Sequence, residues 1–409
     1  MQVAGIIAEY NPFHNGHLYQ ITQTKAKTGC DAIVAIMSGN FSQRGSATIT
    51  DKFTRTKMAL LNGVDLVLEL PVPFATASAE LFAQGAVSVL HQSQIIDLIS
   101  FGSECGDVSL LDTIAQTFLT HTDELNPLIK EALKRGLSFP RARMEAALTF
   151  LNQFTSLERQ PFIQSALESP NNILGIEYLK AMHKLNASIT PFTVKRIQAN
   201  YHDSQITGTI ASATAIRHSI TANSHNYQQC MPSSASYLLD SNKSPCMEAL
   251  SAFLHFKLMF SNIEELYALW DIPKDLIHTL IKHAQSAPDY QTLVDLSTSK
   301  TYTRATVQRA LLRILLDIRT EEMTSFTKPG SLPYIRVLGC RKDATSLLRP
   351  LSTRSSVPII TNLGKQYSTM NSDQKLLIDY ELRATKLYHY LTQQPKLTTQ
   401  DFTQPFILI

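Results

Sequence analysis

The 409-residue chain contains few cysteines, little charge and no long apolar run. Its five cysteines are scattered without any CxxC pair, which argues against a disulfide framework and against a structural zinc site. No segment approaches the roughly 20 consecutive apolar residues that span a bilayer. The N-terminus lacks the basic and apolar regions of a signal peptide. We therefore expect a cytoplasmic protein with reduced thiols and no membrane contact.

The composition is that of an ordinary globular protein. Apolar residues make up 44% of the chain and charged residues 17%, which excludes disordered and fibrous classes. A chain of this length is expected to form two or three domains. The formal net charge of +3 is too small to indicate a nucleic-acid partner by itself.

The first half of the chain alternates short apolar runs with helical patterns. The apolar runs are β-branched and apolar on both faces, as in covered parallel strands, and they lie at 3–8, 32–38, 64–70 and 95–102. The helical patterns between them lie at 16–27, 51–63 and 78–92. Asp51 is the expected N-cap of the second helix and Gly63 its expected stop. This alternation predicts an α/β fold with a Rossmann-like, doubly wound parallel sheet.

The later part of the chain is expected to be mainly helical. A long helical stretch at about 107–185 is interpreted as an insertion, and a further strand is expected at 189–197. Beyond about residue 225 the strand signal fades and helical periodicity continues. We therefore predict a catalytic domain over 1–225 and a mainly helical domain over 226–409.

The segment NPFHNGH places two histidines where the first strand is expected to end. Ligands of open parallel sheets bind beyond the carboxyl ends of the strands, and a helix that begins near Asn15 would attract phosphate. His14 and His17 would then donate hydrogen bonds that stabilise charge on phosphoryl oxygens. Two surface histidines at a helix start are the ordinary alternative. Zinc binding is a weaker hypothesis, because no third ligand with the spacing of a metal site lies nearby.

A second motif, IASATAIRHSI at 210–220, begins another expected helix. Hydroxyl and backbone N–H groups near Ser212 and Thr214 are suited to bind phosphate oxygens, and Arg217 adds a forked charged contact. Taken alone, this motif is better explained as a capped helix start. Two such motifs in order within one α/β domain are more specific than either one.

The two motifs resemble the HxGH signature and the SSTxxR loop of the nucleotidyltransferase superfamily. Further segments, in order, are similar to the bacterial tRNA(Met) cytidine acetate ligase family over nearly the whole chain: GIIAEYNPFHNGHLYQ, MSGNFSQRG, FGSECGD, PNNILGIEYLKA, VKRI and PYIRVLG. An acidic residue is expected after QRG in this family, and Ser46 stands there instead.

This resemblance implies a reaction in which ATP activates acetate as acetyl-adenylate. The acetyl group then passes to N4 of the wobble cytidine in the anticodon loop of elongator tRNA(Met). The implied catalytic residues are His14, His17, Thr214 and Arg217. The implied ATP-binding residues are Ile7, Ala8, Glu9, Tyr10, Asn11, Pro12, Phe13, His14, Asn15, Gly16, His17, Gly102, Asn171, Asn172, Arg196, Ile197 and Ser212.

Three questions stay open at this level. The PNN motif does not tell whether Asn171 or Asn172 makes the main ATP contact. Mg²⁺ is expected to arrive with ATP and to be held by phosphates, and no protein metal ligand is predicted. No general base for acetyl transfer is evident, since capping or turn hydrogen bonds explain Glu9, Ser38 and Glu104 equally well.

Positive charge is concentrated late in the chain. Residues 300–354 contain 11 Lys or Arg and 4 Asp or Glu, a net of +7. Clustered charge beside aromatic residues favours RNA contact over a solvated helix face. The expected RNA-binding residues are Lys300, Arg304, Arg309 and Arg313, together with Arg44 in the MSGNFSQRG loop. That loop is equally well explained as a polar turn.

Another group of basic residues lies in the helical pattern at 51–63 and consists of Lys52, Arg55 and Lys57. We interpret this group as a solvated helix face, with phosphate contact as the alternative.

Two other classes of function compete with the ligase. An adenylyltransferase for a small phosphorylated metabolite would share the HxGH site but would not need the long basic helical half. A non-catalytic RNA-binding protein would not need intact His14, His17, Thr214 and Arg217.

Overall fold

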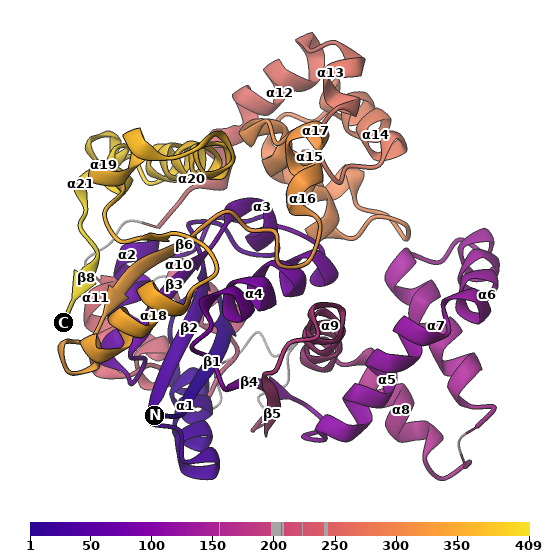
Figure 1. Ribbon diagram of the computed structural model, residues 1–409. Coiled ribbons are helices and arrows are strands. Elements are labelled where there is room, and N and C mark those ends of the chain that lie inside the picture. Colours follow the sequence, from indigo (N-terminus) through magenta and orange to yellow (C-terminus); the bar gives the residue numbers. More distant parts are fainter. Residues whose placement is uncertain (155, 198–205, 207, 223, 241–243) are drawn as a thin grey trace.

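The structure is a computed structural model that describes residues 1–154, 156–197, 206, 208–222, 224–240 and 244–409. Within these ranges, eight strands form one sheet in the order β5-β4-β1-β2-β3-β6-β7, with β8 paired to β6 (Figure 1). The strands are β1 (Val3–Ala8), β2 (Ala32–Ser38), β3 (Leu66–Leu70), β4 (Leu98–Ser103), β5 (Thr190–Lys195), β6 (Ile335–Cys340), β7 (Ile359–Ile360) and β8 (Ile407–Leu408). The first five strands run parallel, and β6 pairs antiparallel with β3.

Both faces of the sheet are covered, as the apolar strands predict. Along β2, Ile33 and Ala35 belong to one core, whereas Val34 and Ile36 belong to the core on the other face. The first core is covered by α1 (Asn15–Thr28), α2 (Lys52–Leu61), α10 (Ala213–Thr221) and α11 (Ser233–Asp240). The second is covered chiefly by α3 (Val72–Ala75), α4 (Ala79–Ser93), α9 (Pro170–Leu185) and α20 (Ser372–Leu391). The predicted doubly wound α/β fold is confirmed.

The predicted elements of the first half are observed with shifted ends. Strand β3 begins at Leu66, two residues later than predicted, and β4 begins at Leu98. Asp51 caps α2 as predicted, since its side chain accepts hydrogen bonds from the N–H groups of Phe53 and Thr54. Gly63 follows the C-cap of this helix with a φ of 98°, a left-handed conformation that glycine adopts without strain.

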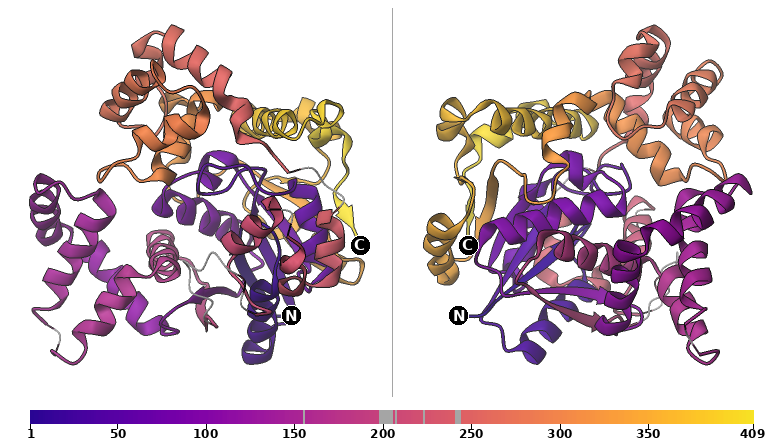
Figure 2. Two further views of the ribbon diagram at one scale, coloured as in Figure 1. Left: turned by 180° about the vertical axis from the view of Figure 1, so that it is seen from behind. Right: turned by 45° about the vertical axis from the view of Figure 1, so that its right-hand side comes forward.

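The predicted helical insertion forms a lobe beside the sheet. It comprises α5 (Val108–Thr120), α6 (Thr122–Lys134), α7 (Phe139–Leu151) and α8 (Gln160–Glu168). Figure 2 shows this lobe projecting beyond α9, which returns the chain to the sheet. Helix α9 packs between α4 and α5 and thereby joins the lobe to the central fold.

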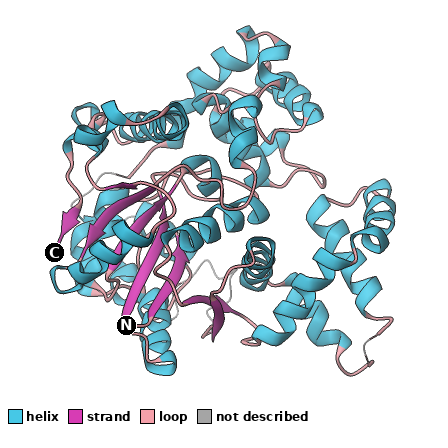
Figure 3. Ribbon diagram, viewed as in Figure 1, coloured by secondary structure: helices cyan, strands magenta, loops and turns pink. Residues whose placement is uncertain are grey.

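The C-terminal half supplies a second helical group and part of the sheet (Figure 3). Its helices are α12 (Ser251–Phe260), α13 (Ile263–Tyr267), α14 (Lys274–Ala284), α15 (Tyr290–Ser297), α16 (Arg304–Leu316), α17 (Thr320–Met323), α18 (Leu348–Arg354), α19 (Leu363–Gln366) and α21 (Gln400–Thr403). Within the described ranges, none of the helices combines the length and apolar character that crossing a membrane requires.

Beyond residue 225 the chain is mainly helical, but it also supplies three strands that the fading strand signal did not indicate, β6, β7 and β8. Strand β6 was missed because Arg336 interrupts its apolar run, and the buried partners of this arginine lie far away in sequence. The division into two domains at residue 225 stays a prediction. If the division is correct, the two domains share one sheet.

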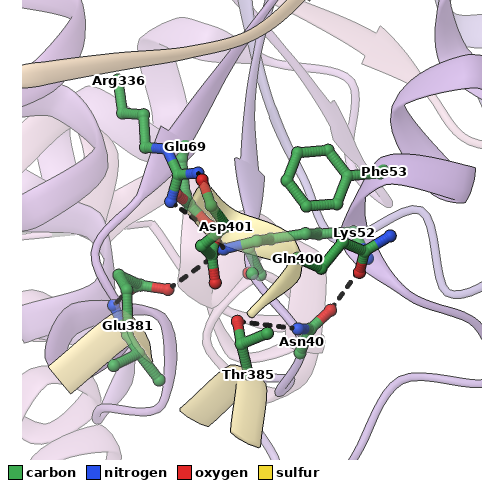
Figure 4. A network of polar contacts seen from close by, with 12 residues as sticks. Asn40, Lys52, Phe53, Glu69, Arg336, Glu381, Thr385, Gln400 and Asp401 are labelled. Atoms are coloured by element: carbon green, nitrogen blue, oxygen red, sulfur yellow. Dashed lines mark hydrogen bonds and ion pairs between the residues drawn. The ribbon is translucent and has the colours of Figure 1, made fainter. Parts of the chain in front are cut away.

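A buried charge cluster joins the two halves of the chain (Figure 4). Lys52 Nζ lies 2.6 Å from Glu69 Oε1 and 2.6 Å from Asp401 Oδ1. Arg336 Nη1 lies 3.0 Å from Glu69 Oε2 and 2.7 Å from Asp401 Oδ1. Glu381 Oε2 is 3.8 Å from Lys52 Nζ. Since Lys52 is wholly buried, interpreting its helix face as solvated was wrong.

Candidate active site

The strand order creates a switch point at the carboxyl ends of β1 and β4. After β1 the chain continues to β2, which pairs with one edge of β1. Strand β4 pairs with the opposite edge of β1, and β5 lies beyond it. Ligands of open α/β sheets bind in the crevice outside such a point. The loop after β1, the end of β4 and the start of α10 all border one pocket there.

The two histidines are fixed by the cap of α1. His14 is the N-cap, and its Nδ1 accepts a hydrogen bond of 3.1 Å from Gly16 N–H. His17 Nδ1 accepts one of 3.2 Å from His14 N–H, and the two rings stack at 3.7 Å. An imidazole nitrogen that accepts a hydrogen bond carries no proton, so each neutral ring carries its proton on Nε2. Both side chains line the pocket and can offer Nε2–H to a ligand.

Both histidines are held neutral. Burial, and then the charges of Arg196 and Arg217, lower the pKa of His14 to about 3. Burial, the neighbouring His14 and the charge of Arg196 lower the pKa of His17 well below its ordinary value. The pair therefore donates hydrogen bonds at neutral pH without adding positive charge. The positive charge of the pocket comes from the arginines.

The second motif reaches the same pocket. Ser212 caps α10, since its side chain accepts a hydrogen bond from Ala215 N–H. Arg217 Nη1 donates to the carbonyl oxygen of Asn11 at 2.7 Å, and Nη2 donates to Thr214 Oγ1 at 3.2 Å. The motif that begins near residue 210 is thereby tied to the loop after β1.

The structure separates the two asparagines at the start of α9. Asn171 lines the pocket, and its Nδ2 donates to Glu104 Oε1 at 2.6 Å. Arg196 Nη1 donates to Asn171 Oδ1 at 3.4 Å. Asn172 is 1% exposed, and its Oδ1 accepts hydrogen bonds from the N–H groups of Glu104 and Cys105 at 2.9 and 3.3 Å. Asn171 therefore borders the pocket, whereas Asn172 shapes the loop after β4.

Alanine substitutions should distinguish the pocket-lining role of Asn171 from the structural role of Asn172. We expect Asn172→Ala to lower the free energy of unfolding by about 1–3 kcal/mol, because two half-buried N–H groups lose their acceptor. We expect Asn171→Ala to leave stability within about 0.5 kcal/mol and to weaken ATP binding. Urea denaturation and ATP titration of both variants measure the two effects. Equal losses of stability in both variants would contradict this assignment.

Most of the predicted residues line this pocket or its direct continuation toward β5. They are Ile7, Ala8, Glu9, Tyr10, Asn11, His14, Gly16, His17, Arg44, Gly102, Asn171, Arg196, Ile197, Ser212, Thr214 and Arg217. Four predicted ATP residues do not line it. Pro12 and Phe13 are buried, Asn172 supports the loop after β4, and Asn15 Nδ2 donates to the carbonyl oxygens of Thr209 and Gln229.

Sequence reasoning missed several pocket residues. They include Phe82, Phe101, Leu174 and Tyr178. The aromatic and aliphatic members lie in α4, β4 and α9, where an apolar residue is normally part of the core. Only the fold shows that one edge of these side chains borders a pocket.

Arg55 organises the loops that border the pocket. It is wholly buried, and its guanidinium donates to the carbonyl oxygens of Glu9 at 2.6 Å, Ser38 at 3.0 Å and Thr50 at 3.1 Å. Burial lowers the pKa of Arg55 to about 10, so it remains charged at neutral pH. A solvated helix face was the wrong interpretation for this residue too. Arg55 ties the ends of β1 and β2 together.

The predicted RNA-binding residues divide into exposed and buried ones. Arg44 and Lys300 are exposed, and Arg304 forms an ion pair with Asp295 at the surface. Arg313 is 1% exposed, pairs with Asp271 at 3.1 Å and stacks on Trp270. The predicted phosphate contact of Arg313 is therefore wrong, because its charge is engaged within the protein.

Arg309 is half-buried against the MSGNFSQRG loop. Its Nη1 donates to the carbonyl oxygen of Gln43 at 3.4 Å. Gly45 has a φ of 76°, and a Cβ atom there would lie 2.5 Å from Arg309 N. Only glycine permits so close an approach of the loop to α16. The helix with the predicted RNA contacts therefore lies directly against a loop that lines the pocket.

The chain matches the HIGH Nucleotidyl Transferase family over residues 1–404. It is 36% identical to the tRNA(Met) cytidine acetate ligase of Clostridium perfringens and 37% identical to that of Acetivibrio thermocellus. Each alignment covers both chains completely. The chain belongs to the tRNA(Met) cytidine acetate ligase family. The resemblance stated from its motifs is thereby confirmed.

Solved structures of the family share this fold. The chain superimposes on Thermotoga maritima TmcAL in its apo form with a TM-score of 0.93 and 30% sequence identity. It superimposes on the same protein bound with alpha-thio ATP with a TM-score of 0.90. Both matches cover the whole of each chain.

Proposed function

We propose that the chain is an ATP-dependent ligase that acetylates N4 of the wobble cytidine in the anticodon loop of elongator tRNA(Met). The observation that carries the proposal is the meeting of His14, His17, Thr214 and Arg217 around one pocket at the β1–β4 switch point. The activity named for its relatives and the ATP analogue bound by TmcAL support the same substrates here. We infer from a tRNA substrate that the protein acts in the cytoplasm.

The chemistry explains why ATP is needed. The exocyclic amine of cytosine is a poor nucleophile, because its lone pair is delocalised into the ring. In the first step, an acetate oxygen attacks the α-phosphorus of ATP and the bond to pyrophosphate breaks. Negative charge builds on the phosphoryl oxygens, where the two Nε2–H donors and Arg217 stabilise it. In the second step, the cytidine amine attacks the acetyl carbon and AMP leaves.

The pocket has two parts with some bordering residues in common. This arrangement suits a reaction in which ATP, acetate and cytidine meet at one phosphate. The part toward β5 is bordered by Tyr19, Val194, Ile197 and Ile210, and we assign it to adenosine. The part toward β2 is bordered by Glu9, Gln43, Phe82 and Tyr178, and we assign it to acetate and cytidine. His14, His17 and Arg196 border both parts, so the α-phosphate is placed between them.

Mg²⁺ enters the proposal as an ion that is carried by ATP. Within the described ranges, no three His, Cys, Asp or Glu side chains are placed to hold a metal ion. A magnesium ion in this pocket would therefore take most of its ligands from phosphate oxygens and water. It would supply charge neutralisation to the triphosphate, while the residues above orient the α-phosphate.

Acetate-dependent exchange of pyrophosphate into ATP tests the first step. The proposal requires exchange with acetate in the absence of tRNA. An adenylyltransferase for a phosphorylated metabolite would not exchange with acetate, and a non-catalytic protein would not exchange with any acid. Folded protein that binds ATP but shows no exchange with acetate would contradict the proposal.

We further propose that the exposed residues Arg44 and Lys300, together with the partly exposed Arg304, contact tRNA phosphates. Arg304 begins α16 and Lys300 lies in the loop before it, and α16 packs on the loop that carries Arg44. The proposal thus assigns ATP to residues 1–225 and most of the tRNA contact to residues 226–409.

Salt dependence tests this surface. Because each phosphate contact releases counterions, we expect Lys300→Ala/Arg304→Ala to reduce the slope of log Kd against log salt by about 1–2. Lys130→Ala/Lys134→Ala is the matched control, since it removes two exposed positive charges from α6 in the lobe. Equal slopes for the first pair and the parent protein, measured by filter binding, would remove α16 from the tRNA surface.

A further inference from the structure

One carboxylate borders the part of the pocket that is assigned to acetate and cytidine. Among the described residues that line this part, Glu9 is the only Asp or Glu. The other charged side chains are Arg44, Arg196 and Arg217, and the apolar wall comes from Phe82, Phe101 and Tyr178. Because the Glu9 carboxylate can only accept hydrogen bonds, a substrate group that contacts it is expected to be a hydrogen-bond donor.

The glutamate is held at both its backbone and its side chain. Its carbonyl oxygen accepts a hydrogen bond of 2.6 Å from Arg55. Its Oε1 accepts one of 2.6 Å from the N–H of Gln43. Its other oxygen, Oε2, has no hydrogen-bond partner among the described residues. The next residue, Tyr10, is buried with a φ of 47°, a left-handed turn that directs the chain away after Glu9.

The other two groups near these strand ends are already engaged or enclosed. Both oxygens of Glu104 accept hydrogen bonds at the start of α9, from the backbone N–H groups of Asn171 and Asn172 and from Asn171 Nδ2. Ser38 is wholly buried behind the loop. Of the three candidates for a general base, Glu9 alone lines the pocket.

The side chain of Glu9 is poorly suited to ATP itself. A carboxylate beside a triphosphate is repelled unless a hydroxyl group or a cation lies between them. Glu9 does not border the part of the pocket assigned to adenosine, where the ribose hydroxyls would lie. The backbone of this residue can still pass beside ATP, as the family resemblance implies.

We propose that Glu9 is a catalytic residue of the second step, which recognises the cytosine amine and accepts its proton. This inference rests on the proposed function. Oε2 accepts a hydrogen bond from the N4 amino group, as carboxylates do when they bind cytosine. The N4 lone pair attacks the acetyl carbon, and the N–C bond forms as the C–O bond to AMP breaks. The proton from N4 passes to Oε2, and AMP leaves with the electron pair of the broken bond.

The same contact discriminates between bases. Uracil presents an oxygen where cytosine presents its amino group, and a carboxylate repels that oxygen. A cytosine turned out of the anticodon loop can place its ring against the apolar wall, as flipped bases do on aromatic side chains. Recognition and proton removal thus reside in one group.

Glu9→Gln is the decisive variant, because glutamine keeps the acceptor for Gln43 N–H but removes the base. We expect acetate-dependent ATP–pyrophosphate exchange within about threefold of the parent protein. Single-turnover transfer from added acetyl-adenylate to elongator tRNA(Met) should fall by about 10²–10⁴-fold. Glu80→Gln is the matched control, since it removes a carboxylate of α4 that lies outside the pocket.

The rates of exchange and transfer together show whether Glu9 is the base of the second step. Lost transfer with retained exchange supports Glu9 as the base of the second step. Parent-like transfer by Glu9→Gln overturns the inference, and so does an equal loss of exchange and transfer, which would place Glu9 in the first step or in folding. Absence of transfer by the parent protein would overturn the proposed function, and the inference with it.

Discussion

Replacing Lys52 with methionine is expected to lower the free energy of unfolding by about 3–5 kcal/mol, because a buried ion pair then loses one partner. Lys52 lies between Glu69 and Asp401, and all three side chains are at most 3% exposed. Without Lys52, Arg336 alone would face these two carboxylates. Buried charge without compensation is among the few causes of so large a loss.

The third carboxyl group of the cluster behaves differently. Burial and the charge of Glu69 raise the pKa of Glu381 well above its ordinary value, which favours the neutral form of this carboxyl group. Burial alone would also raise the pKa of Asp401, but Lys52 and Arg336 outweigh it and hold that pKa below its ordinary value. When Glu381 is neutral, the two cations balance the two carboxylates. Glu381→Gln, which keeps a neutral side chain, should cost less than about 1 kcal/mol.

Lys57→Met is the matched control for Lys52→Met. Lys57 lies in the same helix but is exposed, so its replacement should change stability by less than about 0.5 kcal/mol. Urea denaturation of the three variants at pH 7 measures these differences. If Lys52→Met were as stable as Lys57→Met, the cluster would contribute nothing to the joining of the two halves.

Replacing His17 with alanine is expected to slow adenylation of acetate by about 10²–10³-fold, as when one donor to a developing oxyanion is lost. His17 Nδ1 is committed to the cap of α1, so Nε2–H is the group that remains for phosphate. The loss should appear in kcat, because the charge that this donor stabilises develops in the transition state. The lost capping hydrogen bond adds about 0.5–2 kcal/mol of destabilisation.

His91→Ala is the control for this variant. His91 lies in the last turn of α4, which leads back toward the amino end of β4, at the edge of the sheet opposite the pocket. Its exchange rate should equal that of the parent protein. Thermal unfolding of both variants separates the effect on rate from the effect on stability. A folded His17→Ala protein with parent-like exchange would remove His17 from the chemistry.

The sequence predicts the catalytic half well because its signals are local. Alternating apolar strands and helices define β1 to β5, and the HxGH segment follows β1 directly. Parallel strands bring their carboxyl ends to one edge, so motifs almost 200 residues apart meet in one pocket.

The remainder could not be predicted because it depends on contacts between distant segments. Nothing local distinguishes Lys52, Arg55 or Arg313 from a solvated cation, since their partners are known only once the chain has folded. Strand β6 is hard to predict for the same reason, because Arg336 interrupts its apolar run and the acidic partners of this arginine lie far away in sequence. Asn171 and Asn172 are adjacent in sequence, and only the first turn of α9 directs one to the pocket and the other to a loop.

We expect this chain to acetylate cytidine in tRNA. The most direct test is incubation of the purified protein with ATP, labelled acetate and bulk tRNA, followed by mass analysis of the nucleosides. We expect labelled N4-acetylcytidine that depends on ATP and is strongly reduced in His17→Ala. Absence of any acetylated nucleoside, with folded protein that still binds ATP, would contradict the ligase activity and favour an adenylyltransferase of small metabolites.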